Sequence, residues 1–400
     1  MAEKKNLPEI RFNGFSEQWE ANEFSLMVTR ISSISGKVGL PRVEYEDIIS
    51  GKGELNKNIY QKDSSKIGIE FDNGDVLYGK LRPYLKNWLL SSFNGIAVGD
   101  FWVLRAIEIN SKFIYYLIQT STYETAANQS TGTKMPRSDW NVVSKTEFFI
   151  PKIKKEQSQI GTYFQHLDHL ITLQQSKYDK LVNVKKAMLE KMFPKEGADV
   201  PEIRFKGFNG AWEERKFGKC VLIQRGGSPR PIENFMTDDE NGINWIKIGD
   251  VAIGSRYITK TKEKIISEGE KHSRKVQKGD LILSNSMSFG RPYIMAIDGC
   301  IHDGWLLIRD EKKMFDLEYL LQLLSSDYML NQYRALASGG VVINLNSELV
   351  QSTNVLIPNK DEQHKIGYFF THLDHLLTLH QQELEKLKNI KKACLEKMFV

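Results

Sequence analysis

Paired cysteines and long apolar runs are both missing from this 400-residue sequence. No stretch of about 18 or more apolar residues occurs, which argues against a transmembrane helix. The N-terminal segment MAEKKNLPEIRF lacks the apolar stretch of a secretory signal. The three cysteines, Cys220, Cys300 and Cys394, lie far apart, without the spacing of a zinc or redox motif. The sequence therefore predicts a cytoplasmic protein with no membrane partner.

A strong charge imbalance is also missing. The 55 lysines and arginines exceed the 50 aspartates and glutamates by only five. Such a small excess is compatible with an anionic partner but does not predict one by itself. With 41% hydrophobic and 26% charged residues, the chain is long and apolar enough to form two domains with separate cores.

Motifs that bind cofactors or carry out common catalysis are absent too. The sequence contains no G-x-G-x-x-G after a strand, no P-loop, no G-x-S-x-G and no H-E-x-x-H. An Asn-Pro-Pro-Tyr loop, typical of amino-methyltransferases, is also lacking. Asp75 and Asp280 each follow a glycine and precede a β-prone run, which is ordinary turn chemistry. The sequence therefore predicts a protein that is not an enzyme.

What the sequence does contain is a long direct repeat. PEIRFNGF at 8–15 returns as PEIRFKGF at 201–208, and the segment 164–193 returns with few changes at 370–399. The first pair is offset by 193 residues (201 − 8) and the second by 206 (370 − 164), so the inserts differ in length. Solenoid repeats have periods of roughly 20–50 residues. The repeat therefore predicts two domains of one architecture that carry two different surfaces.

Each insert reads as a mixed globule of short strands and helices. β-prone runs alternate with turn residues, an aspartate (Asp100 or Asp303) precedes one matched run, and a short amphipathic stretch follows it. After Pro151 and Pro358 the pattern changes to a long amphipathic helix. We therefore expect an α+β fold with a globule at 1–152, a helix at 153–193, a linker at 194–200, a globule at 201–358 and a helix at 359–400.

Both long helices carry an apolar seam at heptad spacing. Two matching seams in one chain can bury each other, and a duplicated unit favours an antiparallel coiled coil with pseudo-twofold symmetry. The residues predicted to pair the helices are Ile160, Leu167, Leu170, Leu181, Val184, Ile366, Leu373, Leu376, Leu387 and Ile390.

A repeated His-Leu-Asp-His element, at 166–169 and 372–375, places two histidines on one helical face. Histidines at this spacing can bind a metal, but each leucine lies in the seam and no third or fourth ligand is nearby. The pattern favours a polar flank that sets helix pairing or docks a partner, and we expect no metal.

Basic and aromatic residues in the loops are candidates for DNA contacts. LRPY at 81–84 and GRPY at 290–293 suit a phosphate or guanine contact, and equally a solvated turn. Cations in the loop 129–137 stand where asparagines occur in the loop 337–346, a difference that would read different base edges. The candidate DNA-binding residues are Lys80, Arg82, Tyr84, Lys134, Arg137, Arg225, Ser228, Arg230, Arg291, Tyr293 and Asn344.

The repeated PEIRF-x-GF openings with Trp19 and Trp212, the Gly-Asp runs followed by RPY, and the HLDHL…LEKMF helices resemble the specificity subunit of Type I restriction–modification systems. The resemblance covers essentially the whole chain. It implies two target-recognition domains that each read one half of a split double-stranded DNA target, and a coiled coil that sets the gap. It also implies no catalytic site in this chain. Two methyltransferase subunits that use S-adenosylmethionine would dock on it, and restriction subunits that use ATP and Mg can join.

Two other interpretations stay open from the residues alone. A scaffold of two globules and a coiled coil could bind proteins without any sequence preference for DNA. A self-sufficient DNA methyltransferase is a third interpretation, which the lack of a cofactor loop disfavours.

Overall fold

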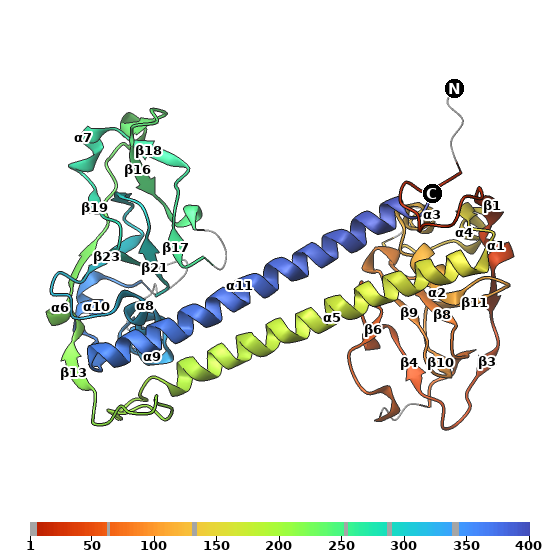
Figure 1. Cartoon of the computed structure of the whole chain (residues 1–400), viewed down its shortest axis with the longest axis horizontal. Coiled ribbons are helices and arrows are strands. Elements are labelled where there is room, and N and C mark those ends of the chain that lie inside the picture. The colour runs from red at the N-terminus through yellow and green to blue at the C-terminus, as the bar shows by residue number, and fades with distance from the viewer. Residues whose placement is uncertain (1–5, 62–64, 130–133, 252–254, 286–289, 338–343) are drawn as a thin grey trace. The chain divides into compact units, whose positions relative to one another are not determined.

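The computed structural model describes residues 6–61, 65–129, 134–251, 255–285, 290–337 and 344–400. They form two compact units, Met1–Ser176 with Gln381–Val400, and Lys177–His380. Figure 1 shows that each unit combines a sheet-containing globule with parts of two long helices, α5 (Lys154–Lys191) and α11 (Lys360–Lys397). Among the described residues, no helix has the length and apolar character needed to cross a membrane.

The first globule is built on two four-stranded sheets. The antiparallel sheet has the order β2-β11-β8-β9, and the mixed sheet β3-β7-β10-β4 contains one parallel pair, β10 with β4. Two short pairs, β1-β12 and β5-β6, complete the globule. The strands are β1 Glu20–Glu23, β2 Val28–Ile31, β3 Ile34–Ser35, β4 Arg42–Val43, β5 Ile48–Ile49, β6 Glu54–Leu55, β7 Gly68–Phe71, β8 Val76–Gly79, β9 Trp88–Leu90, β10 Gly95–Ala97, β11 Phe101–Ala106 and β12 Glu147–Ile150. The helices are α1 Phe24–Met27, α2 Ser111–Leu117, α3 Ser121–Ala127 and α4 Trp140–Lys145.

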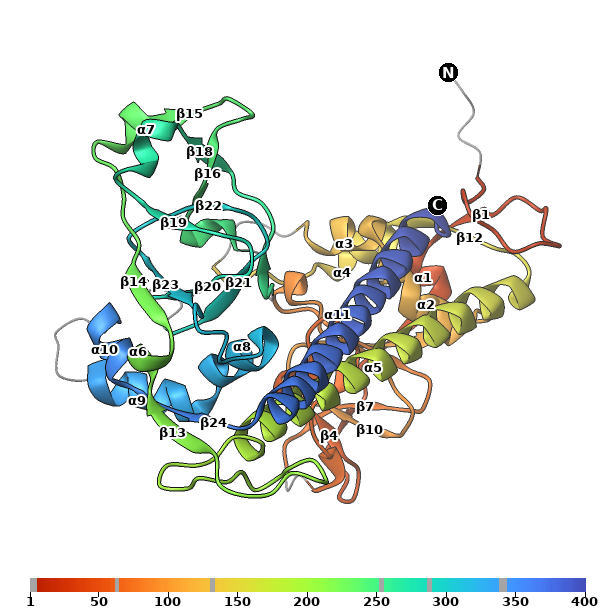
Figure 2. The ribbon, with the colours of Figure 1, turned by 60° about the vertical axis from the view of Figure 1, so that its left-hand side comes forward.

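The second globule repeats this plan with two five-stranded sheets, β14-β23-β20-β21-β17 and β15-β18-β16-β22-β19, and one short pair, β13-β24. Figure 2 shows β14, β23, β20 and β21 side by side. The strands are β13 Glu213–Lys216, β14 Leu222–Arg225, β15 Met236–Thr237, β16 Ile243–Ile246, β17 Tyr257–Ile258, β18 Glu263–Ile265, β19 Arg274–Val276, β20 Leu281–Ser284, β21 Pro292–Met295, β22 Gly299–Ile301, β23 Trp305–Arg309 and β24 Asn354–Ile357. The helices are α6 Phe217–Cys220, α7 Ser267–Glu270, α8 Leu317–Ser325, α9 Asp327–Ala337 and α10 Ser347–Ser352.

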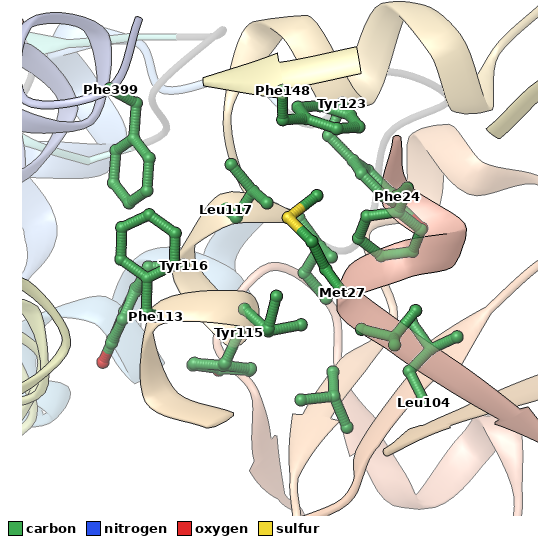
Figure 3. Packing of buried hydrophobic residues seen from close by; sticks show 14 of the residues in the cluster. Phe24, Met27, Leu104, Phe113, Tyr115, Tyr116, Leu117, Tyr123, Phe148 and Phe399 are labelled. Atoms are coloured by element: carbon green, nitrogen blue, oxygen red, sulfur yellow. The ribbon is translucent and has the colours of Figure 1, made fainter. Parts of the chain in front are cut away.

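The core of each globule is completed by residues just past the end of the helix that belongs to the other repeat. In the first unit Phe399, beyond α11, packs against Phe113 of α2 with ring centroids 5.2 Å apart (Figure 3). In the second unit Phe193, beyond α5, stacks on Tyr319 of α8 at 5.8 Å. The near-identical LEKMF segments therefore close two equivalent cores.

The repeated PEIRF segment fastens each globule to the start of its own long helix. Arg11 donates two hydrogen bonds to Glu156, of 2.6 and 2.8 Å, and the indole N–H of Trp19 donates to the same carboxylate at 3.3 Å. Arg204 makes the matching pair with Glu362, at 2.7 Å for both bonds. The hydrogen bond to Glu156 raises the pKa of Arg11 above its usual value. The sequence repeats this segment because each helix needs the same attachment.

The two long helices run antiparallel within each unit, as expected from the repeat. In the first unit Lys391 of α11 lies 2.6 Å from Asp168 of α5. In the second unit Lys185 of α5 lies 2.6 Å from Asp374 of α11. These two ion pairs are the same contact in the two repeats, offset by 206 residues (374 − 168 and 391 − 185).

Three residues of the predicted seam lie outside it in the structure. The side chains of Leu170, Val184 and Leu376 are 47%, 43% and 41% exposed, so they lie outside the seam, which corrects the prediction for these three. At Phe164 and Phe370 the fully buried position follows the first set by four residues, whereas near the end of α11 Ile390, three residues after Leu387, is half-buried. The other predicted pairing residues are buried or half-buried: Ile160, Leu167, Leu181, Ile366, Leu373, Leu387 and Ile390.

The register was ambiguous because a stripe that repeats every seven residues can place its second member three or four residues after the first. Both positions are partly apolar in this sequence. Aromatic residues occupy both positions at the start of each helix, and the structure buries Phe164 and Phe370 fully but Tyr163 and Phe369 only in part.

Candidate nucleic-acid interface

In the first globule, predicted DNA-binding residues meet at one edge of the antiparallel sheet. Lys80 follows β8 and Asp100 precedes β11, and the backbone N–H of Lys80 donates to the carbonyl of Asp100 at 2.9 Å. The Arg137 guanidinium lies 3.0 Å from the Asp100 carboxylate, and the Lys80 ammonium lies 3.6 Å from it. A backbone bridge between Leu81 and Arg137 holds the two segments together. The structure thus brings Lys80 and Arg137 to one carboxylate.

Arg82, Tyr84 and Lys134 lie on the same two segments and have exposed side chains. Arg82 adopts a left-handed conformation, with φ of 49°, and its N–H donates to the carbonyl of Pro136 at 2.7 Å. Pro83 then begins a short 3-10 turn at 83–85, which presents Tyr84 to solvent. The part of the loop at 130–133 lies outside the described residues.

Tyr45 holds the two segments of this edge together through its hydroxyl group, a role that the sequence did not predict. Its hydroxyl oxygen accepts from the N–H of Leu81 at 2.8 Å, and its O–H donates to the carbonyl of Asp100 at 3.0 Å. Burial raises the pKa of the Tyr45 hydroxyl, which therefore stays protonated and able to donate. No local pattern in the sequence marks this role, since Tyr45 lies 36 residues before Leu81.

The second globule places a similar cluster at the matching sheet edge, around Asp303 before β23. Ser228 donates to the Asp303 carboxylate at 3.0 Å, and Arg230 lies 3.4 Å from it. Arg225, at the end of β14, donates to the Asp303 carbonyl at 3.3 Å. The His302 ring nitrogen Nε2 is 3.1 Å from the carboxylate. A hollow of about 900 Å³ opens beside this cluster.

The surroundings keep the Asp303 carboxylate charged. Burial acts to raise its pKa, but the hydrogen bond from Ser228 and the charges of His302, Arg225 and Arg230 outweigh burial and leave the pKa below its usual value. The carboxylate is therefore ionised at neutral pH and holds Arg230 by charge as well as by hydrogen bonding.

The backbones of Arg291 and Asn344 lie near this end of the sheet, and the Arg291 side chain lines a separate hollow together with Arg256 and Asp374. The Arg291 carbonyl accepts from the N–H of Ser284 at 3.0 Å, at the end of β20. Asn344 is exposed and precedes Leu345, whose N–H donates to the carbonyl of Asn285 at 2.9 Å. The neighbouring loop residues 338–343 lie outside the described residues.

The prediction of a DNA contact by Tyr293 is wrong. Its side chain is only 3% exposed and packs edge-on against Trp305, with ring centroids 5.6 Å apart. Tyr293 lies within β21, where all four residues are buried, so the strand carries it into the core. The ring instead supports the Arg291 guanidinium, which lies 5.4 Å from the ring centroid.

The two Gly-Asp aspartates have structural partners in the described part of the chain. Asp75 binds Arg105 through both carboxylate oxygens, at 2.8 and 2.7 Å, and Asp280 binds Arg309 at 2.8 and 2.6 Å. Both carboxylates also accept backbone N–H groups, as a turn aspartate does. Within the described ranges, no group of three or more His, Cys, Asp or Glu side chains is arranged to hold a metal ion.

Comparison with known protein families gives two matches along the chain. The model for the Type I restriction modification DNA specificity domain matches residues 7–183 and again 209–389. These two segments contain both sheet edges described above.

Two relatives from Methanocaldococcus jannaschii are each 22% identical to this chain. The Type I restriction enzyme MjaVIII specificity subunit aligns over 66% of this chain and 64% of its own length, just under two thirds. The putative type I restriction enzyme MjaX specificity subunit aligns over 98% of this chain and 90% of its own length.

Two solved structures share the fold. A chain from a structural study of complex assembly and conformational transition of the type I R-M system is 19% identical, covers 94% of this chain and 96% of its own, and superposes with a TM-score of 0.58. The Type-I restriction-modification system S subunit from M. genitalium is 14% identical, with 98% and 99% coverage and a TM-score of 0.57.

Proposed function

Because the chain belongs to the family of Type I restriction modification DNA specificity domains and carries two copies, we propose that it is a DNA sequence-specificity subunit. Each globule reads one half of a bipartite, asymmetric DNA target, and the chain itself catalyses no reaction. The observation that carries this proposal is the pair of basic clusters, one around Asp100 and one around Asp303, at matching sheet edges. Phosphate contacts and base contacts both need cations and amides at such an exposed edge.

The clusters differ in the loops that supply them, which supports two unlike half-sites. In the first globule the cations come from the segment after β8 and from Lys134 and Arg137. In the second they come from the end of β14, with Arg225, and from the loop after it, with Arg230. Different side chains at an equivalent edge would read different base edges.

Methyltransferase and restriction subunits are the partners we propose for the long helices. Both helices expose the same pair of leucines, Leu170 and Leu173 in α5, and Leu376 and Leu379 in α11. Each pair lies on one face, three residues apart, and an exposed repeated apolar pair suits two copies of one partner. The partner subunits, and not this chain, would use S-adenosylmethionine and ATP with Mg. We propose the cytoplasm as the site of action. We also propose the domain limits that the sequence predicts.

Sequencing of methylated adenine in host DNA, with and without this gene, tests the proposal. We expect a gapped, asymmetric methylation motif to disappear when the gene is removed and to return when it is restored. If the same motifs are present in both genomes, the proposal is wrong. The scaffold alternative predicts that result, and it also predicts no sequence preference in a gel-shift competition with the methyltransferase subunit present.

Lys134→Ala should weaken DNA binding equally for all sequences. The Lys134 side chain is exposed on the loop beside Arg137, and we expect it to contact phosphate. Loss of one phosphate contact lowers the slope of log affinity against log salt by about 1. Titrations at several salt concentrations, with the partner subunits present, measure this slope. Lys152→Ala is the matched control, because Lys152 is an exposed lysine that pairs with Glu20 away from the sheet edge.

A further inference from the structure

We propose that Asp100 and Asp303 each form, with an arginine, a reader for one G·C base pair, so that each half-site contains a G·C pair set by its own Arg–Asp unit. The inference rests on the proposed function and goes further, because it names the base pair and adds two acidic residues to the recognition surface. The units are Asp100 with Arg137 and Asp303 with Arg230.

Both Arg–Asp pairs are accessible to solvent. Side-chain exposure is 51% for Arg137 and 29% for Asp100, and 80% for Arg230 and 31% for Asp303. Asp303 and Arg230 also line the hollow of about 900 Å³ at this edge. The ion pair of Asp75 with Arg105 is not accessible in this way, because Asp75 is buried. The second repeat has the equivalent structural pair, Asp280 with Arg309.

The two arginines come from different parts of the fold. Arg137 follows α3 and lies 37 residues after Asp100, whereas Arg230 follows β14 and lies 73 residues before Asp303. The aspartates nevertheless precede equivalent strands, β11 and β23. Different loops thus supply an arginine to the same carboxylate position. Exposed ion pairs contribute little to stability, so stability alone does not explain a carboxylate with an arginine at both edges.

The charges of an Arg–Asp pair favour a base pair over a phosphate as its ligand. A carboxylate beside an arginine repels a phosphate, so an Arg–Asp pair is a poor backbone contact. A G·C pair suits it better in the major groove. Guanine offers the uncharged acceptors O6 and N7 to arginine, and cytosine offers its N4 amino group to a carboxylate. The carboxylate also holds the arginine before DNA arrives, which lowers the entropy lost on binding.

Methylation motifs of single variants in the complete system test this inference. Asp100→Asn and Arg137→Ala should each allow other base pairs at one G·C position in one half of the motif. Asp303→Asn and Arg230→Ala should do the same at one G·C position in the other half. Loss of a good bidentate contact should reduce discrimination at that position about 5- to 150-fold. Arg137→Lys, which keeps the charge and loses the fork, should relax the same position. Lys152→Ala and Arg215→Ala, which alter exposed ion pairs elsewhere, should leave the motif unchanged.

A second measurement separates recognition from folding. Asp100→Asn removes a negative charge, so binding to nonspecific DNA should become tighter while discrimination falls, whereas a misfolded variant would lose both. An unchanged motif, or relaxation confined to A·T positions, overturns the inference while the proposed function stands. A wild-type chain that directs no methylation motif overturns the proposed function and the inference with it.

Discussion

Replacing Arg11 with alanine should lower the free energy of unfolding of the first unit by about 3 kcal/mol, the lower end of the range for breaking a buried ion pair. Glu156 is only 1% exposed and accepts two hydrogen bonds from Arg11. Without the guanidinium, the one side-chain hydrogen bond left to this carboxylate among the described residues is the longer bond from Trp19. Denaturant unfolding followed by circular dichroism measures the change.

Arg204→Ala is the matched variant in the second unit, where Glu362 is equally buried. We expect a loss of similar size there, although the indole N–H of Trp212, the counterpart of Trp19, has no hydrogen-bond partner among the described residues. Lys37→Ala, which breaks the exposed pair with Glu70, is the control and should change little. The double variant Arg11→Ala with Glu156→Gln should recover part of the loss, because no buried charge is then left unpaired. Unfolding of Arg11→Ala at the wild-type midpoint would contradict the assignment.

Repeated features of the sequence predicted the architecture well. The duplicated openings and helices indicated two equivalent globules and an antiparallel helix pair, and the structure has both. A repeat is informative because it keeps the residues that make the same contact twice, such as Arg11 and Arg204. The sequence did not predict which side chains these arginines bind, since Glu156 lies 145 residues away from Arg11.

The candidate DNA surface was less predictable for a physical reason. Its residues converge from loops far apart in the chain, as Arg230 and Asp303 do, and no periodicity links them. Asp100 and Asp303 were visible as aspartates before matched strands, but only the fold brings arginines to them. Tyr293 was assigned wrongly because a fully buried strand such as β21 has no alternation of polar and apolar residues to indicate its outer face.

Leu167→Ala and Leu170→Ala, three residues apart in α5, should have opposite consequences. Leu167 is 6% exposed and packs in the core of the first unit, so its truncation should lower the free energy of unfolding by about 3 kcal/mol. Leu170 is 47% exposed, and its truncation should change stability little. Under the proposed function, Leu170→Ala should instead weaken binding of the methyltransferase subunit about 5- to 30-fold, through lost burial of about 1–2 kcal/mol.

The second helix supplies the matched pair, Leu373 and Leu376, with 7% and 41% exposure. Denaturant unfolding and calorimetric titration with the methyltransferase subunit, applied to all four variants, separate the two effects. Because the partner is expected to bind both helices, Leu376→Ala should weaken binding as Leu170→Ala does. An equal loss of stability in Leu167→Ala and Leu170→Ala would show that Leu170 packs in the seam, as the three-residue spacing predicts. Normal partner binding by a stable Leu170→Ala, Leu376→Ala double variant would place the docking surface elsewhere.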